Sequence, residues 1–138
     1  MVKPVQTRAS LSIASTALSE GRMLELAEKV AMATDLPVGR LRLEARTPHS
    51  TSISLRDHLE GAELLRFDVR TDRAVGRTTV RTAITTWRTK EGGVASLVPM
   101  AKRKLLGFGA YESFMDQYVT AILAEDANAI VTLVDGRE

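Results

Sequence analysis

The chain of 138 residues contains no cysteine. This absence excludes a disulfide framework, a thiolate metal site and thiol catalysis. It agrees with a reducing compartment, and we expect the protein in the cytoplasm. We also expect a single domain, residues 1–138, because a chain of this length buries a core large enough to be stable without a cross-link.

Long apolar runs are missing as well. No stretch is long enough to span a bilayer, and residues 1–4 lead directly into alternating polar and apolar residues rather than into the apolar region of a signal peptide. The formal net charge is only +2, and aromatic residues make up 4% of the chain. Nucleic-acid-binding sheets add exposed aromatics for stacking, and only Trp87 qualifies here, so we expect no nucleic-acid partner.

Several segments alternate apolar with polar residues, as half-buried strands do. The expected strands cover residues 5–14, 40–46, 53–55, 65–70, 78–87 and 94–98. We expect turns at residues 47–50, 71–73 and 90–93, and a loop or helical turn at 56–63. Residues 130–134 fit either a last short strand or a mobile tail.

Two segments follow the helical period instead. The first begins after Ser19, a favourable N-cap, and ends near Asp35, because the residues before Pro37 leave the helical conformation. The second lies within residues 100–125, and Gly107 and Gly109 predict a kink or a late start. The fold class that follows is α+β, with a curved antiparallel sheet of about six to seven strands wrapped on a long C-terminal helix.

In the order of its strands and helices most of the chain resembles the START-like superfamily, also called the polyketide cyclase/dehydrase or helix-grip fold, and the local resemblance is strongest from residue 85 to residue 126. The residues that carry the resemblance are Leu97, Val98, Pro99, Gly107, Tyr111, Phe114 and Asp126. The resemblance implies a sheet that grips the last helix, with a cavity between them for an apolar or amphipathic small molecule. It implies no particular reaction, since many relatives only bind or carry.

The candidate ligand-binding residues lie on the inward faces of this arrangement. They are Phe67, Thr78, Thr82, Thr86, Tyr111, Phe114, Met115 and Tyr118. One interpretation is a cavity wall, in which hydroxyl groups supply the few polar contacts of an apolar pocket. The other is an ordinary packed core. The threonines favour the cavity slightly, because a buried hydroxyl needs a partner.

Trp87 falls out of phase with the apolar face of its strand. A bulge could return it to the core, it could anchor an interface between two copies, or an arginine could pack over its ring.

A basic run, Lys102, Arg103 and Lys104, precedes the last helix and is either an anion-binding site or a solvated charged segment.

No other motif predicts catalysis. His49 and His58 lie in expected loops without metal-ligand spacing, so we read them as surface residues and expect no metal. The segment from Gly107 to Gly109 lacks the third glycine of a dinucleotide fingerprint, and no cofactor is expected.

The leading function is therefore binding of a small apolar or amphipathic molecule. One alternative is a homo-oligomer, a homodimer for example, with a filled core, using Trp87 and one edge strand. The other is a cyclase- or hydrolase-type enzyme in which Tyr111 or Tyr118 donates a proton.

Overall fold

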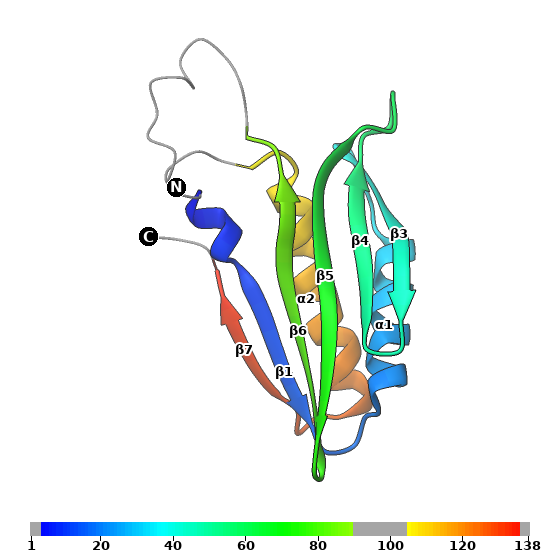
Figure 1. Cartoon of the computed structure of the whole chain (residues 1–138), viewed down its shortest axis with the longest axis vertical. Helices are drawn as coiled ribbons and strands as arrows, with labels where there is room; N and C mark the ends of the chain where they lie inside the picture. Colours follow the sequence, from blue (N-terminus) through cyan, green and yellow to red (C-terminus); the bar gives the residue numbers. More distant parts are fainter. Residues whose placement is uncertain (1–3, 90–104, 136–138) are drawn as a thin grey trace.

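The computed structural model describes residues 4–89 and 105–135 (Figure 1). It is an α+β fold, as predicted, with a curled antiparallel sheet shaped like a half-barrel. In chain order the elements are η1 (Val5–Arg8), β1 (Ser10–Ser15), α1 (Glu20–Ala33), β2 (Asp35–Leu36), β3 (Gly39–Thr47), β4 (Ser50–Arg56), β5 (Glu63–Ala74), β6 (Arg77–Trp87), α2 (Phe108–Glu125) and β7 (Ile130–Val134).

The sheet has seven strands in the order β2-β3-β4-β5-β6-β1-β7, and every neighbouring pair is antiparallel. Both helices cover the same face of the sheet, and the other face carries no helix among the described residues (Figure 1). This one-sided cover explains the alternation of the strands, since one face of each strand meets the helices and the other meets solvent. In β5, for example, Leu65, Phe67 and Val69 are buried.

The first strand begins later than the sequence predicts. Residues 5–8 form a 3-10 turn after Pro4, whose carbonyl oxygen accepts hydrogen bonds from the Thr7 backbone N–H and hydroxyl group. The predicted alternation nevertheless places Ala9, Leu11 and Ile13 in the core, each at most 1% exposed.

The turn predicted at residues 71–73 is wrong. β5 continues to Ala74, which pairs with Arg77, and the two residues between them make the turn. Gly76 there has φ +74°, a conformation that glycine adopts without strain. Pairing with β6 therefore overrides the turn preference of residues 71–73.

A bulge interrupts β6 near its end. Ile84 pairs with Phe67 and Thr86 pairs with Arg66, which leaves Thr85 as an extra residue. The bulge reverses the phase of the strand, so Trp87 pairs with Leu65, is half-buried and packs against the core. The first of the three interpretations of Trp87 is thus confirmed. The same bulge makes the predicted inward position of Thr86 wrong, since this residue is exposed.

Each helix begins next to a residue that the sequence indicated, α1 after Ser19 and α2 after Gly107. The Ser19 hydroxyl accepts from the Arg22 backbone N–H 3.1 Å away, which caps α1. Gly107 precedes α2 in the left-handed conformation, with φ +73°, so this helix starts late, as predicted. With 18 residues α2 is not the long helix that we expected.

Residues 130–134, for which the sequence allowed either a strand or a tail, form a strand. β7 pairs with β1 in unbroken register, from Ser10 opposite Val134 to Ala14 opposite Ile130. The strand expected at residues 94–98 and the hairpin at 90–93 lie outside the described residues.

Candidate functional site

The predicted ligand-binding residues form an aromatic cluster between α2 and the sheet. Phe67 from β5 contacts Tyr111 and Phe114 from α2, with ring centroids 4.9 Å and 4.8 Å apart. Phe114 stacks on Tyr118 at 5.5 Å. All four side chains have no exposed surface, and Met115 beside them is 3% exposed. The sequence therefore placed these residues together correctly.

The Tyr111 hydroxyl takes part in a buried network at the N-terminal side of β1. It donates to the Ala9 carbonyl oxygen at 2.9 Å and lies 2.8 Å from Oγ1 of Thr82. A phenol carries one proton, so Thr82 is the donor in that second bond. The same Thr82 oxygen accepts from the Leu11 backbone N–H at 2.9 Å. Each polar group of the network thus has a partner inside the protein.

The Tyr118 hydroxyl donates to the Met23 carbonyl oxygen at 2.8 Å, which connects α2 to α1. Burial raises the pKa of both phenols, that of Tyr111 to about 12 and that of Tyr118 further still. A general acid works best with a pKa near the operating pH. These pKa values and the lack of exposed surface give the proton-donor role no support.

The threonines of β6 have different surroundings. Thr78 is fully buried and its hydroxyl oxygen accepts from Arg73 Nη1 at 2.5 Å, whereas the exposed Thr86 donates to Glu63 Oε2 at 3.1 Å. Among the described residues, no buried side-chain nitrogen or oxygen lacks a hydrogen-bond partner. The cluster therefore has the polar contacts of a satisfied core, and its role in ligand binding stays a prediction.

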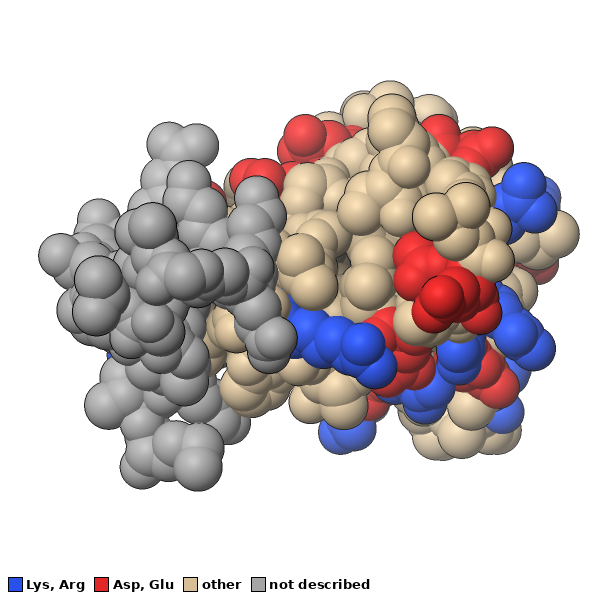
Figure 2. Space-filling view, turned by 90° about the horizontal axis from the view of Figure 1, so that it is seen from above, with Lys and Arg blue, Asp and Glu red and all other residues tan. Residues whose placement is uncertain are grey.

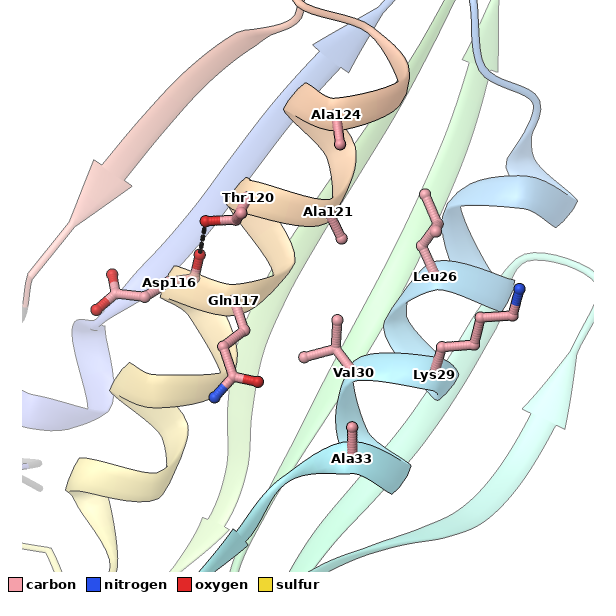
Figure 3. Close-up of a pocket in the computed structure, with 9 residues that line it drawn as sticks. All are labelled: Leu26, Lys29, Val30, Ala33, Asp116, Gln117, Thr120, Ala121 and Ala124. Atoms are coloured by element: carbon pink, nitrogen blue, oxygen red, sulfur yellow. Dashed lines mark hydrogen bonds between the residues drawn. The ribbon is translucent and has the colours of Figure 1, made fainter.

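An open groove lies instead between the two helices, on the side away from the sheet (Figure 3). Its volume is about 580 Å³. The residues that line it are Leu26, Lys29, Val30, Ala33, Asp116, Gln117, Thr120, Ala121 and Ala124. Val30 and Ala121 point into the gap from opposite helices, and the lining is mainly aliphatic.

Polar groups lie at the two outer margins of the groove (Figure 3). On α1, Lys29 Nζ is 3.4 Å from Glu25 Oε1, and both side chains are more than half exposed. On α2, the Thr120 hydroxyl donates to the Asp116 backbone carbonyl oxygen at 3.1 Å. The Asp116 side chain is exposed, and its carboxylate points away from the gap between the helices. The lining of the groove is thus mainly apolar, with the Gln117 amide on its α2 wall and one charge of each sign at its margins.

The sequence contained a signal for this groove that we did not use. On α1, Leu26, Val30 and Ala33 follow the spacing i, i+4, i+7 beside the stripe that faces the sheet. On α2, Ala121 and Ala124 continue this surface, whereas Gln117, one turn before Ala121, is polar. The apolar face of α1 is therefore wider than the sheet alone covers, and α2 adds two alanines beside it.

The two histidines are exposed loop residues, as predicted. His49 Nδ1 lies 2.8 Å from Glu20 Oε2, and His58 Nε2 lies 2.7 Å from the Leu36 carbonyl oxygen. No group of three metal-ligating side chains occurs among the residues that the structure describes. Lys102, Arg103 and Lys104 lie outside those residues.

Several arginines on the open face of the sheet pair with carboxylates of neighbouring residues or strands. Arg70 contacts Asp68 at 3.0 Å and Arg56 contacts Glu44 at 2.9 Å. Figure 2 views the molecule from above and also shows basic and acidic side chains next to one another on its described part. Cross-strand and neighbouring ion pairs are the ordinary arrangement on a solvated sheet.

No helix in residues 4–89 or 105–135 combines the length and the apolar character needed to cross a membrane. Comparison with protein families, curated proteins and solved structures found no match for this chain.

Proposed function

We propose that the protein binds a small apolar or amphipathic molecule in the groove between α1 and α2. The observation that carries this proposal is the aliphatic lining contributed by both helices, with Val30 and Ala121 facing one another across open space (Figure 3). Pockets for small molecules are mostly apolar, with a few polar groups at their margins, and have volumes of roughly 300–1,000 Å³. The groove matches this description in its volume and in its lining.

The length of the groove favours a small molecule over a helix of another protein. Its lining runs from Leu26 to Ala33 on α1 and from Asp116 to Ala124 on α2. At a rise of 1.5 Å per residue these stretches are about 10–12 Å long, which is only two helical turns. A docked helix normally presents anchors over more turns than this, whereas a chain of about ten carbon atoms fits the length.

The margins suggest how such a molecule would lie. Its apolar part would rest on Leu26, Val30 and Ala121, and an anionic end would lie near Lys29. Asp116, at the opposite margin, disfavours an anion there, so the two charges give the bound molecule a preferred direction.

The test uses anilinonaphthalene sulfonate, an anionic amphipathic probe whose fluorescence rises in apolar surroundings. We expect saturable fluorescence with the native protein and at least a tenfold weaker affinity for Ala121→Phe, which fills the groove. The matched control is Ala127→Phe, which adds the same ring at an exposed position outside α2. Equal binding by both variants would contradict the proposal.

Native mass spectrometry of the protein purified from its own host gives an independent test. A retained small molecule in the native protein that is lost in Ala121→Phe supports the groove. A retained molecule that Ala121→Phe leaves in place points to another site, the aromatic cluster around Tyr111 included.

The proposal includes membership in the START-like superfamily and a cytoplasmic location. The single face of helix cover, the antiparallel sheet and the Tyr111–Phe114 side of α2 against Phe67 support the first. The absence of cysteine supports the second.

A further inference from the structure

Strand β7 lies at one edge of the seven-stranded sheet. It is last in the strand order and pairs with β1 on one side, so its other backbone edge faces no strand among the described residues. Its apolar side chains are also uncovered, since Ile130, Leu133 and Val134 are 66%, 51% and 48% exposed. Such an edge offers free N–H and C=O groups beside an apolar surface.

The usual devices that keep an edge strand single are missing from β7. Its sequence, Ile-Val-Thr-Leu-Val, contains no charge and no proline. Its register with β1 is continuous, without a bulge that would twist the edge away. Natural proteins place lysine, proline or a bulge on edges that must remain unpaired. Their absence here favours an edge that has a partner.

The sequence of β7 is complementary to itself. If two copies pair antiparallel about a two-fold axis at Thr132, Ile130 lies opposite Val134 of the partner subunit. In the same register Val131 lies opposite the partner subunit's Leu133, and Thr132 lies opposite the partner's Thr132. β-Branched pairs and threonine pairs are favourable cross-strand neighbours, and no charge is buried or opposed.

We propose that β7 pairs with β7 of a second copy of this chain, joining the two sheets into one across a two-fold axis. Closed two-fold dimers are the commonest oligomers of identical chains. Val131 and Leu133 lie beside Ile13 and Leu11 of β1, on the core face of the sheet. The pairing would therefore extend the apolar layer under both helices, which explains why Leu133 is apolar although half of it is exposed.

The contact expected from five paired residues is small. Interfaces that bury less than about 1,200 Å² are typical of weak or transient association. We therefore expect a dimer that dissociates on dilution, which sedimentation velocity measured over a wide range of concentrations would detect.

Cysteine variants test the register, because the native chain has no cysteine to compete. Directly opposed residues have Cα atoms about 4.5–5.5 Å apart, within the range that a disulfide spans. Thr132→Cys should therefore cross-link to itself under mild oxidation. Ile130→Cys should not, since its copies would lie about 14 Å apart. A mixture of Ile130→Cys with Val134→Cys should cross-link, although neither variant does so alone.

A charge variant tests the association itself. Leu133→Lys places a cation in the paired edge and should make the protein monomeric at every concentration, with an unchanged circular dichroism spectrum. The matched control, Leu59→Lys, replaces a loop leucine that is 96% exposed and should leave the dimer intact.

Three results would overturn the proposal. One is a native protein that stays monomeric at the highest concentration, which would leave the edge to a strand of a different protein. Another is a dimer that Leu133→Lys does not weaken. The last is Ile130→Cys cross-linking to itself as readily as Thr132→Cys.

Discussion

The hydroxyl groups of Tyr111 on α2 and Thr82 on β6 lie 2.8 Å apart, both fully enclosed by the protein. Through Ala9 and Leu11 they also hold the backbone of β1, so one network connects the last helix with two strands. Hydrogen bonds of this kind add little net stability while intact but cost much when one partner is removed.

Tyr111→Phe should lower the free energy of unfolding by about 1–3 kcal/mol, because it leaves the Ala9 carbonyl oxygen without this donor and Thr82 without this acceptor. Urea denaturation measures the change. Tyr118→Phe is the matched comparison and should cost less, since its acceptor, Met23, lies within α1, where helix geometry provides another donor. A larger loss of unfolding free energy for Tyr118→Phe than for Tyr111→Phe would contradict the importance that we assign to the Tyr111 network.

Ser15 and Asp126 connect the start of the fold with the end of α2. The Ser15 hydroxyl donates to Asp126 Oδ2 at 2.6 Å and accepts from the backbone N–H groups of Ala17 and Leu18. Ser15→Ala should therefore cost about 1–3 kcal/mol in chemical denaturation. Ser12→Ala, on the same strand, should change stability by less than about 0.5 kcal/mol. If both variants lost the same free energy of unfolding, the hydrogen bonds of Ser15 would add no stability beyond that of an ordinary serine on this strand.

Gly107 and Gly109 predict opposite effects of the same substitution. A Cβ at Gly107 would meet Leu55 Cδ2 at 2.1 Å, and the left-handed backbone there adds about 1–2 kcal/mol for alanine. Gly107→Ala should therefore destabilise the protein. Gly109 has open space around it inside α2, so Gly109→Ala should be neutral or gain up to about 1 kcal/mol. Thermal denaturation of both variants checks the prediction, and a destabilised Gly109→Ala would contradict it.

Glu20 gives the stability a dependence on pH. Its hydrogen bonds with His49 and then Thr71 lower the pKa of the carboxyl group below the ordinary value of 4.5. A carboxyl with a lowered pKa in the folded state stabilises the protein above pH 4.5, and this stabilisation is lost as the pH falls through the folded pKa.

Urea denaturation at a series of pH values tests this dependence. Glu20→Gln should be less stable than the native protein at pH 7, and the difference should shrink below pH 4.5. Glu60→Gln, at an exposed loop position, is the matched control. A difference for Glu20→Gln that stays constant down to low pH would refute the link.

The sequence predicted the strands well because one face of the sheet is covered. Alternation placed Leu11, Phe67 and Val80 in the core, and Gly107 indicated the late start of α2. The turn at residues 71–73 failed because preference for a turn is local, whereas pairing with β6 depends on the whole hairpin. The bulge at Thr85 could not be predicted with certainty, because its only trace in the sequence is a tryptophan out of phase with the apolar face of its strand. An exposed tryptophan at an interface would give the same pattern.

The candidate site was less predictable for a physical reason. A pattern of apolar residues on α2 shows which side chains are buried, but whether they leave space depends on how closely the elements pack. Tyr111 and Tyr118 were placed correctly, yet their partners turned out to be protein groups. The groove beside Val30 and Ala121 depends on the separation of two helices, which residue spacing does not specify.

The position of β1 between β6 and β7 has a consequence for synthesis of the protein. Ser12 lies beside Arg81 and Thr132, so both partners of this strand leave the ribosome long after it. Until then the apolar side of β1 is exposed on the nascent chain, where such segments aggregate or bind chaperones. Closing these distant pairs also makes folding slow relative to that of a helical bundle, because long loops are ordered before their contacts form.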